Sequence, residues 1–63
     1  MEDPAVLRCL DAYRRAHPGE IVGAIGRGLW QAVIPEGTGE RVITRPGLAE
    51  LLGVLGALGA QAR

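Results

Sequence analysis

The N-terminal segment alternates apolar and charged positions with the period of an α-helix. Val6, Leu10 and Tyr13 follow one another at steps of four and three residues, and charged residues fill much of the remaining circumference. This arrangement is typical of an amphipathic helix. An Asp-Pro pair directly before it is a standard helix start, and a His-Pro-Gly sequence ends it. The pattern therefore predicts a helix over residues 4–16.

From residue 20 onward the pattern changes to short β-prone runs separated by glycine-containing turns. The run around Trp30 is rich in aromatic and β-branched residues, which favour strands. Gly23 weakens the run before it, and residues 35–39 have the composition and length of a hairpin loop. This segment predicts an antiparallel meander with strands at about 20–25, 29–34 and 40–44.

The two faces of the central strand are both rich in apolar residues. Trp30, Ala32 and Ile34 share one face, which is wholly apolar, and we expect this face to contact the helices. The opposite face, with Leu29 and Val33, is still mostly apolar. Two interpretations of the opposite face remain open: a further partner covers it, or it forms a rim of the domain.

The C-terminal segment is apolar on almost all sides, and its spacing predicts a helix over residues 47–60. Leucines at helical spacing form a core stripe, whereas the other side carries small residues with Glu50 as its single charge. Each interior glycine costs roughly 0.5–1 kcal/mol relative to alanine. A close approach by another element would offset that cost.

The small-residue side of this helix has three interpretations. It is an interface with another chain, it packs closely on its own sheet, or it touches a membrane. The last is disfavoured, because an interfacial helix normally carries Lys or Arg on a polar face. We favour the first, because a chain of 63 residues does not easily bury a helix on all sides. The candidate interface comprises Gly53, Val54, Gly56, Ala57, Gly59 and Ala60.

Together these elements predict one small α+β domain spanning residues 1–63. A helix is followed by a three-stranded antiparallel meander and a second helix, and both helices pack on one face of the sheet. The expected core is Val6, Leu7, Leu10, Tyr13, Ile21, Trp30, Ala32, Ile34, Val42, Leu48, Leu51, Leu52, Leu55 and Leu58.

The size of the chain makes such a domain marginally stable. A chain of 63 residues buries only about 60% of the surface that it exposes when unfolded. Cys9 is the single cysteine and His17 the single histidine. An intramolecular disulfide is therefore excluded, and a structural zinc site has too few soft ligands. Oligomerisation or very efficient packing remains as the source of stability.

The candidate catalytic groups do not favour an enzyme or a bound cofactor. Cys9 and His17 lie about 12 Å apart along an ideal helix, which is beyond hydrogen-bond reach. Cys9 falls in the apolar register, where we expect a buried thiol. The glycine-rich turns do not lead into a helix, as a phosphate-binding loop would. We expect a non-enzymatic protein without a metal or cofactor.

Charge supplies an alternative hypothesis, a nucleic-acid-binding regulator. Arg27, Arg41 and Arg45 could cluster on the meander, where Trp30 could stack on a base. However, the chain has seven basic residues, all arginine, and seven acidic ones. This neutral total argues against binding to phosphates.

The apolar stretches are too short to span a membrane. The longest, residues 48–60, falls below the roughly 20 residues that a span requires. The first 17 residues mix basic and acidic side chains and lack the apolar segment of a signal peptide. We expect a cytoplasmic protein.

Three segments carry a resemblance to known proteins. Residues 13–19, residues 28–32 and residues 46–52, with Val42 and Ile43 between the last two, resemble small uncharacterised actinobacterial proteins. In that group a helix ending near His-Pro precedes a Trp-bearing hairpin and a leucine-rich helix. Residues 28–58 also loosely resemble part of the arm-binding domains of phage-type integrases and of small antitoxins, which are basic or carry a separate DNA-binding part. The resemblance implies a fold and no activity.

The leading functional hypothesis is therefore a small interaction or oligomerisation module. It is either a homo-oligomer or an accessory or regulatory subunit of a larger bacterial protein. The marginal size of the chain and the glycine-bearing apolar helix motivate this hypothesis.

Overall fold

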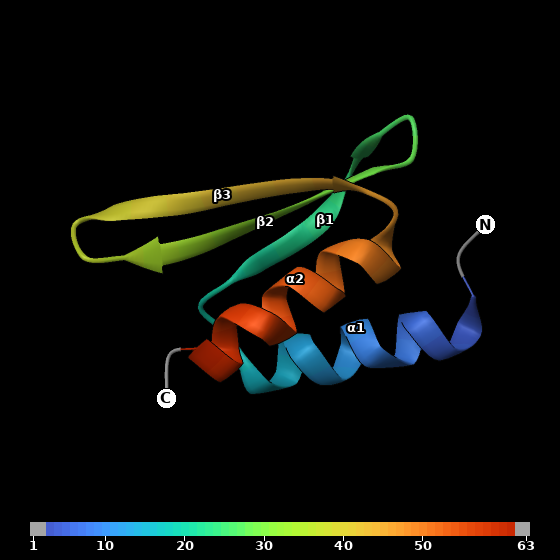
Figure 1. Cartoon of the computed structure of the whole chain (residues 1–63), viewed down its shortest axis with the longest axis horizontal. Coiled ribbons are helices and arrows are strands. Elements are labelled where there is room, and N and C mark those ends of the chain that lie inside the picture. Colours follow the sequence, from blue (N-terminus) through green and yellow to red (C-terminus); the bar gives the residue numbers. More distant parts are fainter. Residues whose placement is uncertain (1–2, 62–63) are drawn as a thin grey trace.

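The computed structural model describes residues 3–61 of the chain. A helix, three strands and a second helix follow one another in the order that the sequence predicts (Figure 1). The α+β class and the antiparallel meander are therefore confirmed. The elements are α1 (Pro4–Ala16), β1 (Ile21–Gly26), β2 (Leu29–Glu36), β3 (Gly39–Pro46) and α2 (Leu48–Gln61).

Helix α1 begins at the predicted residue because Asp3 caps it. The backbone of Asp3 is extended, and its Oδ1 accepts a hydrogen bond of 2.7 Å from the N–H of Ala5. This bond satisfies one of the free amides at the start of the helix. At the other end, Arg14 and Arg15 occupy the last turn, where their positive charge suits the helix dipole.

The hairpin between β2 and β3 is tighter than the five-residue loop predicted from the sequence. The ladder continues through Pro35 opposite Glu40 to Glu36 opposite Gly39. Strand β1 pairs with β2 only as far as Val33, so one side of β2 is free at Pro35. The missing N–H of a proline is tolerated at such a position. The predicted loop over residues 35–39 is therefore wrong.

Helix α2 is tied to the turn between β1 and β2. Gly47 has a φ of 91°, and its N–H donates a hydrogen bond of 2.8 Å to the carbonyl of Gly28. The carbonyl of Gly47 accepts from the N–H of Leu51, one helical turn ahead. A residue with a Cβ rarely adopts this φ, which accounts for glycine at the sharp entry into α2.

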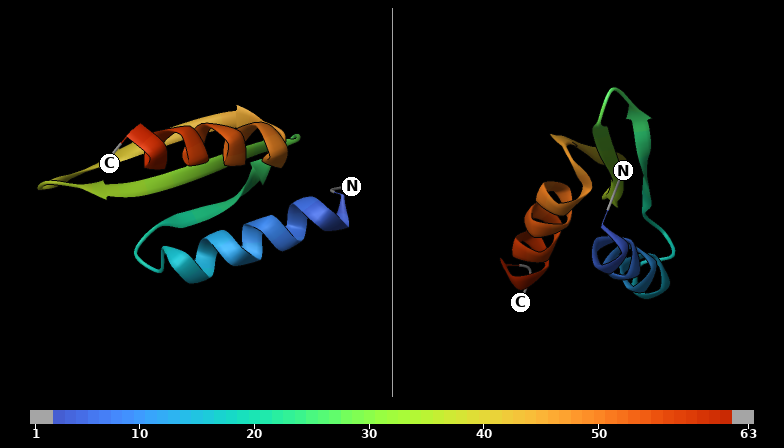
Figure 2. Two further views of the ribbon diagram at one scale, coloured as in Figure 1. Left: turned by 60° about the horizontal axis from the view of Figure 1, so that its bottom comes forward. Right: turned by 90° about the vertical axis from the view of Figure 1, so that its right-hand side faces the viewer.

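Both helices lie on the same face of the sheet, as predicted (Figure 2). Helix α2 packs under β2 and β3, and α1 lies beside α2. Neither described helix has the length and hydropathy needed to cross a bilayer. The side of the sheet away from the helices is not covered by any described element.

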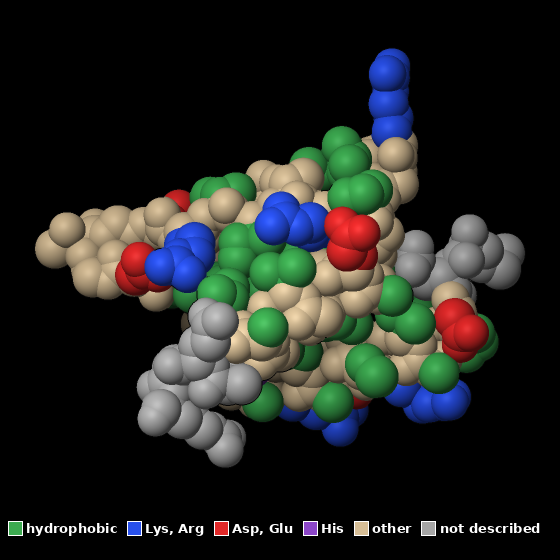
Figure 3. Space-filling view, viewed as in Figure 1, with side chains coloured by type: hydrophobic (Ala, Val, Ile, Leu, Met, Phe, Trp, Pro, Cys, Tyr) green, Lys and Arg blue, Asp and Glu red, His purple; other side chains and the backbone are tan. Residues whose placement is uncertain are grey.

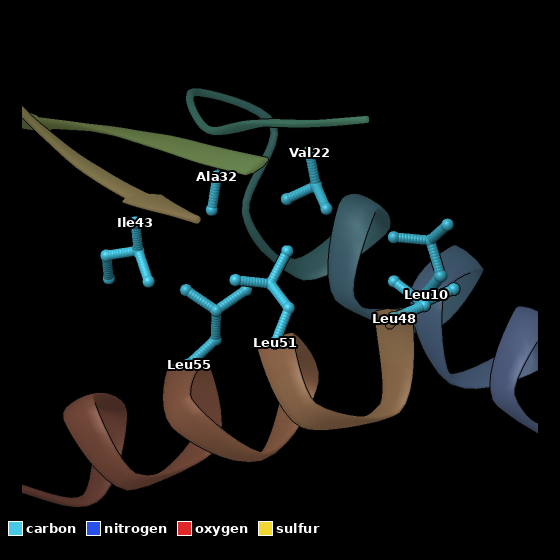
Figure 4. Packing of buried hydrophobic residues seen from close by; sticks show 7 residues of the cluster. All are labelled: Leu10, Val22, Ala32, Ile43, Leu48, Leu51 and Leu55. Atoms are coloured by element: carbon cyan, nitrogen blue, oxygen red, sulfur yellow. The ribbon is translucent and has the colours of Figure 1, made fainter. Parts of the chain in front are cut away.

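The core lies between α2 and one cross-strand row of the sheet (Figure 4). Val22, Ala32 and Ile43 pair across the three strands and are buried. From the helices, α2 contributes three buried leucines and α1 contributes one. These are Leu48, Leu51 and Leu55 of α2 and Leu10 of α1.

Two predicted core residues in the outer strands are wrong. Ile21 is 69% exposed and Val42 is 54% exposed, because each points to the side opposite the helices. Each stands next to another apolar residue, Val22 or Ile43, so the period of two does not decide which of the pair faces inward. A shift of one residue moves a side chain to the other face of a sheet.

Helix α1 buries a narrower stripe than its sequence predicts. Leu10 is buried, and Val6 and Tyr13 pack against the core. Leu7 is 44% exposed, and Cys9 is also exposed, which contradicts both predictions of burial. These two residues flank the stripe on either side, and α1 rests mainly against α2 rather than against a broad sheet surface.

Candidate interaction surfaces

The small-residue side of α2 faces away from the core. Ala49, Gly53, Gly56 and Ala57 are exposed, and Glu50 is the one charged residue in the helix. A Cβ placed on Gly53 or Gly56 would meet no heavy atom within 4 Å. The interpretation that these glycines permit close packing on the chain's own sheet is therefore wrong.

The other members of the predicted interface differ in position. Val54 is half-buried and packs against the core, so it is not part of the exposed side. Gly59 is exposed, and a Cβ placed on it would meet no heavy atom within 4 Å. Ala60 lies outside the residues whose side chains the structure describes.

A second apolar surface, which we call the outer sheet face, lies on the side of the sheet away from the helices. Four of its large side chains are exposed: Ile21 by 69%, Val42 by 54%, Ile25 by 51% and Leu29 by 37%. Figure 3 shows from one side that hydrophobic groups reach the surface along the sheet, with charged side chains among them. From the sequence, the central strand alone indicated that this face is apolar.

The outer sheet face has a regular pattern of rows across the strands. One row contains Ile21, Val33 and Val42, which are cross-strand neighbours. Two positions further along the strands, Gly23, Gln31 and Thr44 form a smaller and more polar row. Leu29 and Pro46 form the next row, with Ile25 close by at the β-bulge of β1. Two apolar rows thus flank a central row that is half-buried.

The two edges of the sheet are less available than this face. At β1, Arg14 reaches over from α1, and its Nη2 donates a hydrogen bond of 2.5 Å to the carbonyl of Val22. Strand β3 carries Glu40, Arg41 and Arg45 and ends in Pro46. Charged side chains and proline are features that oppose pairing with another strand. The surface open for association is therefore a face and not an edge.

A polar cluster joins the end of α1 to the start of β1. The hydroxyl of Tyr13 donates a hydrogen bond to Oε1 of Glu20, and Nδ1 of His17 lies 3.4 Å from Oε2 of the same carboxylate. The rings of Tyr13 and His17 stack with centroids 4.3 Å apart. Burial, the hydrogen bond to Glu20 and the charge of that carboxylate raise the pKa of Tyr13 above its ordinary value. These contacts hold the connection from α1 to β1 in place.

The four residues of the nucleic-acid hypothesis do not form one site. Trp30 is half-buried and packs against the core on the helix side of the sheet. Arg41 is paired with Glu36, with Nε 2.9 Å from Oε2, and Arg45 donates to the carbonyl of Thr44. Arg27 stands at the tip of the β1–β2 turn, at the end of the sheet away from Arg41. The Trp30 ring, which would have to stack on a base, therefore packs against the core instead.

The thiol and the titratable groups in the described part of the chain show no arrangement for metal binding. Within residues 3–61, no three His, Cys, Asp or Glu side chains come together in a group that could hold a metal ion. Cys9 is exposed, and its position in α1 is two turns before His17.

No protein-family model, curated protein or solved structure matches this chain. The resemblance to small actinobacterial proteins therefore stays a prediction.

Proposed function

We propose that this protein is a small non-enzymatic interaction module that works by associating with another protein chain. The observation that supports this most directly is the outer sheet face, where Ile21, Ile25, Leu29 and Val42 remain exposed. Full burial of such a side chain contributes about 1.5–3 kcal/mol. Large apolar side chains gathered at the surface on one face of a domain typically mark an interaction site.

The small core supports the same proposal. Among the residues whose side chains the structure describes, Leu48 and Leu51 are the two large side chains that the fold buries completely. Small domains of this kind gain stability by association. A partner on the outer sheet face would cover the second side of the sheet, and the sheet would then lie between two apolar layers.

The exposed side of α2 is a second candidate surface for a partner. Gly53, Gly56 and Ala57 make it smooth and nearly uncharged, and Gly59 continues it. Small residues let another backbone approach closely and gain van der Waals contact. The outer sheet face offers larger side chains and thus more apolar area for burial.

Sedimentation velocity at concentrations from low micromolar to near millimolar tests this proposal, together with affinity isolation of the tagged protein from its native cells. The proposal expects either reversible self-association or a stoichiometric partner that is lost when Val42→Lys is introduced. Two results together would contradict the proposal. The protein would stay monomeric at every concentration, and it would isolate no stoichiometric partner whose binding is lost on Val42→Lys or Gly56→Leu.

A further inference from the structure

We infer that the outer sheet face binds a second copy of itself, with the strands of the two copies antiparallel across the interface. This inference rests on the proposed function and specifies its partner and its surface. The two-fold axis would run across the strands along the central row of Gly23, Gln31 and Thr44. Four properties of the face support this arrangement: its row spacing, the polar groups of its central row, the charges at its two ends and its area.

The row spacing makes the face complementary to itself. The row of Ile21, Val33 and Val42 and the row of Leu29 and Pro46 lie at equal distances, two positions, on either side of Gln31. A two-fold axis through the central row places each apolar row of one copy over the other apolar row of the second copy. The small central rows then meet, and face-packed sheets approach to about 10 Å.

The central row supplies the polar contacts that such an interface needs. Gln31 and Thr44 are half-buried neighbours in the sheet. In the dimer their side chains would meet those of the second copy, and the amide of Gln31 can both donate and accept hydrogen bonds. Buried polar groups are normally paired in this way.

The charges at the two ends of the face select the antiparallel arrangement. Glu40 lies four positions before Thr44 in β3, near the β2–β3 hairpin, and Arg27 lies in the β1–β2 turn at the opposite end of the sheet. The axis through the central row brings the β1–β2 turn of one copy, which bears Arg27, to the end of the second copy that carries Glu40. A two-fold axis parallel to the strands would instead bring like charges to the same end. Electrostatic complementarity of this kind fixes register and excludes wrong arrangements.

Arg27 and Glu40 are also free for such a contact. Among the described residues, the ion pairs join Arg15 to Asp11, His17 to Glu20 and Arg41 to Glu36 and include neither of the two. The turn that bears Arg27 rises on the side of the sheet away from the helices (Figure 1). Arg27 has a φ of 52°, where asparagine or glycine is normally preferred. The turn itself therefore gives no reason for a large charged side chain at this position.

The area predicts a weak dimer. Eight residues at about 3.3 Å and three strands at about 4.8 Å give a footprint of roughly 26 by 14 Å. With the relief of the side chains, two copies would bury on the order of 1,000 Å², which is at the lower limit for a specific interface. We therefore expect self-association in the micromolar range.

Sedimentation velocity of the full chain and of matched variants tests the inference, and circular dichroism checks that each variant is folded. We expect Val42→Lys to abolish the dimer, because it would bury an unpaired charge in the interface. The variant should still fold, because Val42 is 54% exposed in the single chain. We expect Arg27→Glu and Glu40→Arg each to weaken the dimer about tenfold, and the two together to restore it. The control Gly56→Leu, on the exposed side of α2, should leave the dimer unchanged.

Each other outcome overturns the inference in a recognisable way. A dimer that survives Val42→Lys and is lost in Gly56→Leu places the interface on α2, which contradicts the inference and leaves the proposed function intact. Single charge variants that weaken the dimer, without recovery in the double variant, rule out the antiparallel arrangement. A wild-type chain that remains monomeric near millimolar concentration excludes the second copy as the partner. Partner isolation then decides the proposed function independently.

Discussion

The hydroxyl of Tyr13 donates a hydrogen bond to the carboxylate of Glu20, across the loop that connects the first helix to the sheet. The carboxylate also contacts His17, whose ring stacks on that of Tyr13. This polar contact adds to the apolar packing of Leu10 and Val6 in positioning the helix. The half-buried Glu20 side chain is 17% exposed, so the bond is partly shielded from water.

Removal of the Tyr13 hydroxyl should therefore weaken the fold. We expect Tyr13→Phe to lower the free energy of unfolding by about 1 kcal/mol, since a partly exposed bond to a charged acceptor is worth less than a fully buried one. Urea unfolding followed by circular dichroism measures this change. Equal unfolding midpoints for the two proteins would show that the bond has no net effect.

The same bond makes stability depend on pH in the alkaline range. The pKa of Tyr13 is raised in the folded chain by burial, by the hydrogen bond to Glu20 and by the charge of that carboxylate. Its pKa in the unfolded chain is about 10. The neutral phenol thus stabilises the fold fully below about pH 10, and this contribution is lost as pH rises through the higher folded value.

Two measurements check this pH dependence. Tyr13 is the single tyrosine, so the absorbance of tyrosinate reports its titration directly. Urea midpoints of the wild type should fall above about pH 10, and those of Tyr13→Phe should fall less. A tyrosinate titration at the ordinary pKa of a free tyrosine would contradict the prediction.

The exposed glycines of α2 predict an increase in stability on substitution. A Cβ at Gly56 meets open space, so Gly56→Ala should raise the free energy of unfolding by about 0.5–1 kcal/mol. The control is Gly28→Ala, which should lower it by about 1–2 kcal/mol because Gly28 has a φ of 75°. Thermal unfolding of the two variants measures the gain in stability expected for Gly56→Ala and the loss expected for Gly28→Ala. A loss of stability in Gly56→Ala would indicate that another backbone approaches this side.

Two leucines that were both predicted to lie in the core differ in their burial. Leu51 is fully buried, whereas Leu7 is 44% exposed. We expect Leu51→Ala to cost about 3 kcal/mol, which unfolds much of a marginal domain, and Leu7→Ala to cost less than about 1 kcal/mol. Chemical denaturation measures the free energy of unfolding of both variants. Similar losses for both substitutions would show that Leu7 is buried in solution.

Sequence patterns defined the elements well where a local signal exists. The Asp-Pro start fixed the first helix, and the leucine spacing fixed the buried stripe of the second. The apolar alternation in β2 placed Ala32 correctly on the helix side. In β1 and β3 two consecutive apolar residues left the phase undecided, and only pairing with β2 selects Val22 and Ile43 for the core.

The candidate surfaces were predictable only in part. The small residues of α2 are visible in the sequence, but whether another element approaches Gly53 and Gly56 is a property of the tertiary packing. The outer sheet face combines side chains from three strands, and its rows exist only once the register is known. For that reason the exposed positions of Ile21 and Val42 were not predictable from the sequence alone.

The hydrogen bond from Arg14 to Val22 has a consequence for the size of any assembly. With β1 guarded by this arginine and β3 by its charges and proline, the sheet cannot readily grow by adding strands at its edges. Contact through the outer sheet face about a two-fold axis uses that face completely in both copies. Such a contact would close on itself, so the proposed assembly would stop at two chains and would not continue into a fibre.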